Sequence, residues 1–130
     1  MSKIPMISII DDDDSMRKAT RRLIRSLGLD ADTFSSAEEF LESNRVGDTS
    51  CLITDMQMPG LSGADLQRIL IARGVNTPII FITAFPEEGA RARVLDAGAI
   101  GFLSKPFKEE SLISCLKIAL GNQGEAHFER

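Results

Sequence analysis

The sequence predicts an α/β fold, a (βα)5 arrangement around a doubly wound sheet of five parallel strands, and three observations support it. Short apolar runs recur along the chain, and each is followed by a stretch with helical periodicity. Several of these runs contain almost no polar residue, which is typical of strands that are covered on both faces of a sheet. Strict alternation of strands and helices favours parallel strands that are joined by helical crossovers.

The first strand and helix are clearly marked. Residues 6–10 form an apolar strand, and the helix that follows is expected to take Asp14 as its N-cap and to end at Gly28. One face of this helix carries residues at the spacing of a buried stripe: Met16, Thr20, Leu23, Ile24 and Leu27. Basic residues of the same segment are interpreted as a solvated helix face: Arg17, Lys18, Arg21, Arg22 and Arg25.

The middle of the chain predicts two further strand–helix units. Residues 30–34 form a short, weak strand, and Ser35 or Ser36 caps a short helix that stops before Gly47. The apolar run 51–54 forms the third strand. The helix after it is expected to direct three residues inward: Leu66, Ile69 and Leu70.

The last part of the chain predicts two more units. Residues 78–83 form the fourth strand, and residues 86–97 form a helix with few large apolar side chains. A helix of this kind is weakly anchored, so we expect it to be a moving part. Residues 100–104 form the fifth strand and residues 108–120 the last helix, while the polar segment 121–130 is interpreted as a linker or a frayed end.

Length and composition restrict the class of protein. A chain of 130 residues fits one domain that needs no disulfide or structural metal, and its net charge of −4 argues against nonspecific binding of nucleic acid by this segment. No apolar run approaches the roughly 18 residues of a membrane span, and the N-terminus does not have the pattern of a secretory signal. Cys51 and Cys115 lie in separate apolar stretches and are interpreted as buried free thiols, so we expect a cytoplasmic protein.

Polar groups stand at the carboxyl ends of four predicted strands. Asp11 and Asp12 follow the first strand and Asp55 follows the third, while Thr83 ends the fourth and Lys105 follows the fifth. The carboxyl ends of parallel strands border the ligand crevice, so these groups are expected to converge there. Mg²⁺ would relieve the repulsion between the carboxylates. An aspartate can also act as the nucleophile in phosphoryl transfer, which makes Asp55 a candidate phosphoacceptor.

Local sequence keeps these groups available. The loop after Asp55 contains a proline and two glycines, so the next helix begins later and the carboxylate is not consumed as its cap. A cis bond between Lys105 and Pro106 would turn the lysine back into the crevice, where it would neutralise a phosphoryl group. The hydroxyl of Thr83 would donate to a phosphoryl oxygen.

These residues and their neighbours resemble the receiver domain of bacterial two-component response regulators, the CheY-like family. The motifs that carry the resemblance are Ile9-Ile10-Asp11-Asp12-Asp13, Thr54-Asp55-Met56-Gln57-Met58-Pro59 with Ser62-Gly63, Ile82-Thr83-Ala84 and Gly101-Phe102-Leu103-Ser104-Lys105-Pro106-Phe107. Residues 34–41 are similar to the FixJ-type subgroup. The resemblance implies a flavodoxin-like sheet with strand order 2-1-3-4-5, a receiver domain at residues 1–120 and a tail or linker at 121–130.

The resemblance also implies a phosphorylation site and a metal site. Asp55 would accept a phosphoryl group from the phosphohistidine of a sensor histidine kinase. Asp11, Asp12 and Asp55 would bind Mg²⁺ together with the backbone carbonyl of Gln57. Gln57 and the bulky Phe85 occupy positions that influence how quickly water reaches the aspartyl-phosphate, and Phe85 is expected to slow dephosphorylation.

The implied switch involves Thr83 and Lys105, which would contact the phosphoryl group, and Phe102, an aromatic residue that would swing inward as Thr83 moves. The helix at 86–97, with the strand and helix after it, is the usual reporting surface of the family and a possible surface for homodimer formation on phosphorylation. The only chemistry expected of such a domain is Mg²⁺-dependent self-phosphorylation and slow autodephosphorylation, so it is not an enzyme in the usual sense.

Three other classes of protein fit the sequence less well. A phosphatase of the haloacid-dehalogenase type requires a second aspartate two residues after the nucleophile, where Gln57 cannot transfer a proton. A flavodoxin-like or nucleotide-binding module requires a phosphate-binding loop of glycines or hydroxyls after the first strand, but this chain has four aspartates there. A receiver-like interaction domain that is never phosphorylated would not need the complete set of site residues.

The sequence does not identify the output. FixJ-type receivers usually precede a helix-turn-helix DNA-binding domain, so control of transcription through an attached or partner domain is the expected output. The alternative is a stand-alone receiver that binds partners or passes phosphoryl groups on.

Overall fold

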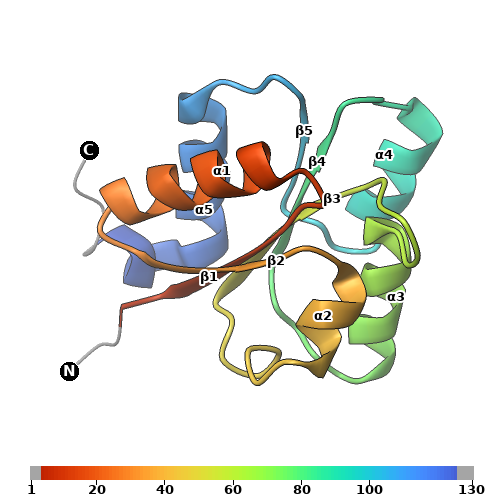
Figure 1. Cartoon of the computed structure of the whole chain (residues 1–130), viewed down its shortest axis with the longest axis horizontal. Coiled ribbons are helices and arrows are strands. Elements are labelled where there is room, and N and C mark those ends of the chain that lie inside the picture. Colours follow the sequence, from red (N-terminus) through yellow and green to blue (C-terminus); the bar gives the residue numbers. More distant parts are fainter. Residues whose placement is uncertain (1–3, 126–130) are drawn as a thin grey trace.

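A computed structural model describes residues 4–125 of the chain, and it contains the predicted alternation of strands and helices (Figure 1). The strands are β1 (Met6–Ile10), β2 (Asp30–Phe34), β3 (Cys51–Asp55), β4 (Ile79–Thr83) and β5 (Gly101–Ser104). The helices are α1 (Asp14–Ser26), α2 (Ala37–Glu42), α3 (Gly63–Ala72), α4 (Glu88–Asp96) and α5 (Glu109–Glu125).

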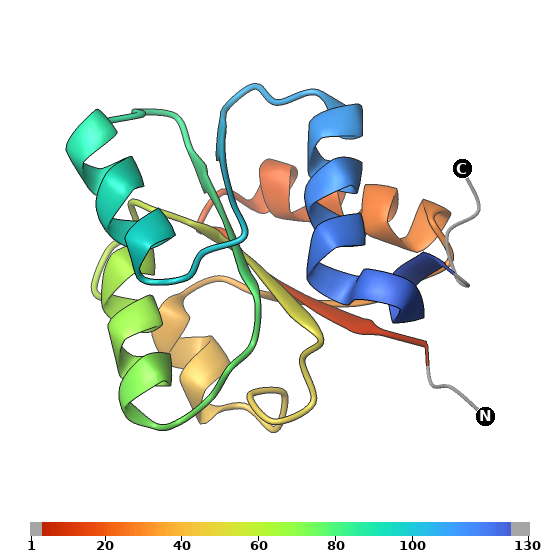
Figure 2. The same ribbon diagram turned by 180° about the vertical axis from the view of Figure 1, so that it is seen from behind.

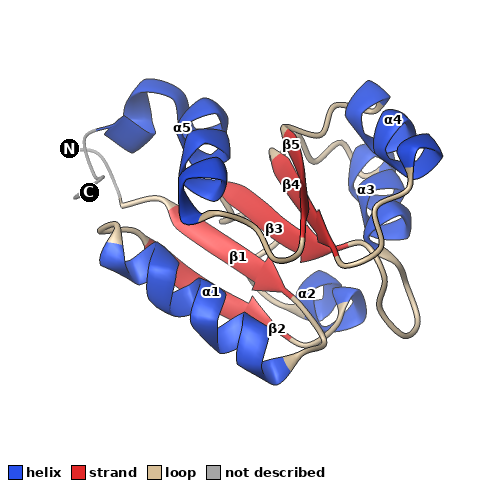
Figure 3. Cartoon of the chain, turned by 90° about the horizontal axis from the view of Figure 1, so that it is seen from above, coloured by secondary structure: helices blue, strands red, loops and turns tan. Residues whose placement is uncertain are grey.

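The five strands form one parallel sheet in the predicted order β2-β1-β3-β4-β5 (Figure 3). All five residues of the central strand β3 are buried, because helices cover both of its faces. The chain steps outward from β1 to β2 and then crosses to β3 on the other side of β1. The carboxyl ends of β1 and β3 therefore border the switch point of the sheet, where ligands bind in open α/β folds.

Alternate residues of each inner strand face opposite layers of the core. In β4, Ile80 and Ile82 pack toward α1 and α5, whereas Ile79 and Phe81 pack toward α2, α3 and α4 (Figures 1 and 2). The helices contribute buried residues to the first layer at Ile24, Leu27, Leu112, Leu116 and Leu120, and to the second at Ala37, Phe40, Leu66, Leu70 and Val94. This packing on both faces holds the strand ends in fixed positions.

The first helix has the expected buried stripe but a different N-cap. Asp13, not Asp14, caps α1: its backbone is extended and its Oδ1 accepts a hydrogen bond from the backbone N–H of Met16 at 3.0 Å. Asp14 is the first helical residue, and its carboxylate forms ion pairs with Arg17 and Lys18. The predicted cap is wrong by one position because Asp14 already has a helical backbone.

The buried face of α3 differs from the predicted one. Leu66 and Leu70 are buried, but Ile69 is only half-buried, and Gln67 lies inside instead. The Gln67 side chain donates a hydrogen bond from Nε2 to the carbonyl of Val94 at 3.0 Å, so a polar contact links α3 to α4. Val94 is the buried residue of α4, as expected of a helix with few apolar anchors.

The last helix extends beyond its predicted end. Residues to Glu125 continue helical after a break at Gly121, where φ is 58°. Residues 122–125 of the predicted tail are therefore helical, and residues 126–130 lie outside the described residues.

The two cysteines are free thiols, as predicted. Cys51 is fully buried, and this burial raises the pKa of its thiol. Cys115 is only half-buried, because it lies at the edge of the layer between the sheet and α5, so the prediction of a buried thiol is wrong there. Among residues 4–125, no helix is long and apolar enough to cross a membrane.

Candidate functional site

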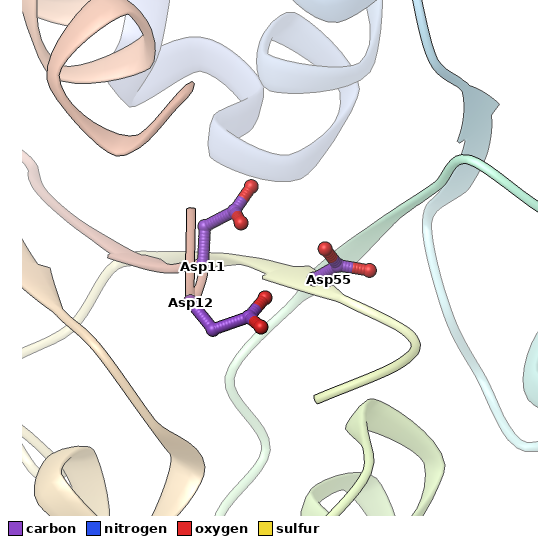
Figure 4. A group of neighbouring side chains, drawn as sticks. All are labelled: Asp11, Asp12 and Asp55. Atoms are coloured by element: carbon purple, nitrogen blue, oxygen red, sulfur yellow. The ribbon is translucent and has the colours of Figure 1, made fainter. Parts of the chain in front are cut away.

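The carboxylates of Asp11, Asp12 and Asp55 meet at the carboxyl edge of the sheet (Figure 4). Ile10 of β1 pairs with Thr54 of β3, so the residue after each of them stands at the same level of the sheet. One carboxylate oxygen from each of the three aspartates lies within 4.8 Å of the others. Three oxygen donors at this spacing, two of them buried and one exposed, suit a hard divalent cation such as Mg²⁺ that keeps part of its water shell.

Lys105 follows the edge strand β5, and its side chain contacts two of these carboxylates. Its Nζ lies 2.8 Å from Oδ2 of Asp55 and 3.1 Å from Oδ2 of Asp11. The peptide bond between Lys105 and Pro106 is cis, and the backbone N–H of Lys105 donates to the carbonyl of Thr83 at 2.7 Å. The lysine side chain is 15% exposed, so it faces the site and not bulk solvent.

The environment shifts the pKa of two of these groups. Burial raises the pKa of Asp11, and hydrogen bonds from the backbone N–H of Asp13 and from Lys105 only partly offset that effect. Burial alone would lower the pKa of Lys105, but its hydrogen bonds and charge interactions with Asp55 and Asp11 outweigh burial and raise it. Lys105 therefore remains an ammonium at neutral pH.

Thr83 ends β4 beside the site and is fully buried. Its hydroxyl donates to Oε1 of Gln57 at 2.6 Å and accepts a hydrogen bond from the backbone N–H of Phe85 at 3.0 Å. The Thr83 hydroxyl therefore lies at the carboxyl edge of the sheet, as predicted, but it donates its proton to Gln57.

Gln57 stands in the loop after β3 and connects to the site through two of its atoms. Its backbone N–H donates to Oδ1 of Asp55 at 3.1 Å, while its side chain accepts from Thr83. Asp55 is thus oriented through both carboxylate oxygens, one by Gln57 and the other by Lys105.

The predicted switch residue Phe102 is half-buried in β5, in register with Phe81 of β4, and packs against the core layer that contains Phe81 and Val94. Phe85, after β4, is 74% exposed. The polar groups that were predicted at the ends of β1, β3, β4 and β5 all lie near the carboxyl edge of the sheet. Phe102 lies against the core layer that contains Val94 of α4.

Arg17 is a contact of the site that the sequence did not indicate. One guanidinium nitrogen donates to the backbone carbonyl of Asp11 at 2.6 Å, and another donates to Asp14 at 2.7 Å. Its side chain is only 17% exposed, unlike that of Lys18, which is 71% exposed. The sequence offered one signal for this contact, because Arg17 lies one turn into the helix that begins at the acidic segment. The same position also fits a solvated helix face.

The fold and the site together define a class of protein: a small α/β domain that presents three carboxylates, a buried threonine and a half-buried lysine at the carboxyl edge of its sheet. Comparison with known proteins identifies the family. The profile of the response regulator receiver domain matches residues 7–117, and the chain belongs to this family. Receiver domains bind Mg²⁺ at an acidic pocket and are in general not catalytic enzymes, and their membership of two-component systems implies a histidine kinase partner.

Relatives and solved structures agree with this assignment. The response regulator protein TodT of Pseudomonas putida is 41% identical over 115 residues, which cover 88% of this chain and 51% of that protein. The transcriptional regulatory protein FixJ of Azorhizobium caulinodans is 34% identical, with 92% of this chain and 56% of that protein covered. The structure of the response regulator StyR has a TM-score of 0.85 and 41% identity, and the match covers 95% of this chain and 63% of that one.

The chain spans about half the length of the curated relatives that it matches. The comparisons therefore establish a response regulator receiver domain with FixJ-like and TodT-like homologues.

Proposed function

We propose that Asp55 is the phosphoacceptor of this receiver domain and that its phosphorylation by a sensor histidine kinase controls an output. The observation that carries this proposal is the place of Asp55 on the central strand. Asp11 and Asp12 lie on one side of it, at the end of β1, and Thr83 lies on the other, at the end of β4. A phosphoryl group on Asp55 would be within reach of both sides.

Phosphoryl transfer to Asp55 requires the protein mainly to position the reacting groups and to neutralise charge. An oxygen of Asp55 forms a bond to phosphorus while the P–N bond of the phosphohistidine breaks, and the electron pair of that bond returns to the imidazole nitrogen. Gln57 and Lys105 already orient the two oxygens of Asp55 before the phosphoryl donor arrives. Lys105 is also placed to neutralise the added negative charge.

The donor set fits Mg²⁺. The carboxylates of Asp11, Asp12 and Asp55 with the backbone carbonyl of Gln57 would hold the ion, and Mg²⁺ would supply positive charge next to the transferring phosphoryl group. With small phosphodonors the same groups would support Mg²⁺-dependent self-phosphorylation, followed by slow autodephosphorylation.

The response would be a shift between two states of the domain. A phosphoryl group favours the active state only by the contacts that it makes better there. Thr83 and Lys105 would supply these contacts, and Phe102 would turn inward as the loop after β4 follows Thr83. The weakly anchored helix α4, which has one buried residue, is the element best suited to move.

Transcription is the output that the relatives favour, because FixJ, of which the match covers 56%, is a transcriptional regulatory protein. A DNA-binding domain attached to this receiver, or a partner that carries one, would then be controlled through α4, β5 and α5, with homodimer formation through the same surface. A stand-alone receiver that passes phosphoryl groups on is the second candidate.

The test is incubation with acetyl phosphate and Mg²⁺ followed by intact mass spectrometry. We expect the parent to gain one phosphoryl group, Asp55→Asn to gain none, and Asp13→Asn to behave as the parent. Asp13 is the matched control because it lies in the same acidic segment but caps α1, a role that asparagine also fills. Phosphorylation of Asp55→Asn at the parental level would refute the assignment.

A further inference from the structure

The hydroxyl of Thr83 already donates its proton in a hydrogen bond to Gln57. The residue is 0% exposed, and a hydroxyl carries one proton to donate. That proton is directed to Oε1 of Gln57 at 2.6 Å, while the hydroxyl oxygen accepts from the backbone N–H of Phe85 at 3.0 Å. To donate to a phosphoryl group on Asp55, Thr83 must first break its hydrogen bond to Gln57.

Gln57 is suited to be a releasable partner. It lies in the loop after β3 and its side chain is exposed, so water can replace its contact when the side chain turns away. Its backbone N–H donates to Asp55 at 3.1 Å, so the same residue contacts both the phosphoacceptor and the threonine that must respond. A phosphoryl group added to Asp55 would therefore meet Gln57 and Thr83 together.

The side-chain contact of a second glutamine, Gln67, differs from that of Gln57. Gln67 is 4% exposed and donates to the carbonyl of Val94 at 3.0 Å, a contact between two helices that lies away from the site. That contact involves neither Asp55 nor the hydroxyl of Thr83. Gln57, by contrast, uses its side chain as an acceptor for the one hydroxyl that the phosphoryl group must recruit.

We propose that the Gln57 side chain is a positioning residue that latches Thr83 in the unphosphorylated arrangement and opposes the switch. This inference rests on the proposed function of Asp55. A hydrogen bond that exists in only one of two states biases the equilibrium toward that state by its own strength. The net strength of one hydrogen bond corresponds to roughly a two- to tenfold change in an equilibrium constant.

The first test uses the unliganded protein. Thr83 has a buried hydroxyl, so its proton is expected to exchange slowly and to be visible by NMR. Gln57→Met keeps the length of the side chain but removes the acceptor, so this resonance should shift or disappear. Gln67→Met, the matched control, should leave it unchanged. An unchanged Thr83 hydroxyl resonance in Gln57→Met would overturn the latch.

The second test measures switching. In Mg²⁺, beryllofluoride stands in for the phosphoryl group, and its apparent affinity is followed by NMR. Gln57→Met should bind roughly two- to tenfold more tightly than the parent, because the competing hydrogen bond is gone. In a Thr83→Val background the same substitution should have no effect, since the latch has no hydroxyl to hold.

The outcomes separate the latch from the function on which it rests. Unchanged or weaker binding by Gln57→Met overturns the latch, and so does an equal increase in both backgrounds, because Gln57 would then act by another route. A parent protein that does not bind beryllofluoride in Mg²⁺ overturns the proposed function and the latch with it.

Discussion

Lys105 and Asp55 form an ion pair, 2.8 Å from Nζ to Oδ2, that joins the ends of β5 and β3 across the intervening strand β4. Both side chains are largely buried, at 15% and 8% exposed. The same ammonium lies 3.1 Å from Asp11, so one cation holds two neighbouring carboxylates together. Its removal leaves two buried charges of the same sign without their shared partner.

Replacement of Lys105 by alanine should therefore affect both stability and response. Without Mg²⁺, the free energy of unfolding should fall by about 1–3 kcal/mol, the usual cost of leaving a buried polar group unsatisfied. Phosphorylation of Asp55 should remain possible, but the conformational change should be weaker. Urea denaturation and NMR with beryllofluoride measure the two effects, and Lys108→Ala, at an exposed lysine, is the control. A fully retained response in Lys105→Ala would count against this role.

Mg²⁺ should stabilise the fold through the acidic cluster. A ligand that binds only the folded state at a hundred times its dissociation constant adds about 2.7 kcal/mol to the free energy of unfolding. Asp12→Asn should lose most of this increment, whereas Asp13→Asn should keep it, because Asp13 is not one of the three clustered carboxylates. Urea denaturation with Mg²⁺ and with a chelator measures the increment. Equal increments in the two variants would contradict a metal site at Asp12.

Stability should also depend on pH through Asp11. Burial raises the pKa of this carboxyl above its ordinary value of 3.8. The folded chain then binds the proton more tightly than the unfolded chain, so the free energy of unfolding decreases as pH rises through the interval from 3.8 to the raised value. Above that interval the cost is constant, and below 3.8 it is lost.

Asp11→Asn removes this titration. The variant should be more stable than the parent at neutral pH without Mg²⁺, and the difference should shrink as the pH falls toward about 3. Urea denaturation at a series of pH values gives the two curves, with Asp13→Asn as control. Parallel curves, with no convergence in acid, would show that Asp11 is not the group responsible.

The strands and the buried layers were predictable because the relevant signals are local. The apolar run of β4 and the stripe of α1 are each set by neighbouring residues, and the strand ends placed Asp55 and Lys105 at the same edge of the sheet. The cap of α1 was not resolved because four successive aspartates all have the right side chain. Only the backbone angles distinguish Asp13 from Asp14.

This distinction is measurable. Asp13→Ala should cost about 0.5–2 kcal/mol of unfolding free energy, because the backbone N–H of Met16 loses its partner. Asp14→Ala should cost less, since that carboxylate is exposed and forms surface ion pairs. Chemical denaturation compares the two variants, with Asp13→Asn expected to remain near the parent. A larger loss for Asp14→Ala would restore the original assignment of the cap.

The contacts of the site that the sequence missed are side-chain contacts at the ends of the strands. The motifs place Thr83 and Gln57 near the same edge, but 26 positions separate them and no periodicity reports how their side chains meet. The tie from Arg17 to the carbonyl of Asp11 was missed for a similar reason, because a side chain that contacts backbone leaves no pattern in the sequence. Such contacts emerge only once packing has fixed the strand ends.

Phe85 provides the last prediction. Its side chain is 74% exposed two residues after the end of β4, and its backbone N–H donates to the hydroxyl of Thr83. We expect a large apolar side chain at this position to hinder the approach of water to a phosphorylated Asp55. Phe85→Ala should therefore shorten the half-life of the aspartyl-phosphate, measured by loss of the phosphoryl group after removal of the donor. Ile71→Ala, at an exposed apolar residue of α3, controls for a general effect of truncation. An unchanged or longer half-life in Phe85→Ala would refute this role, because it would mean that water reaches the site by a route that Phe85 does not cover.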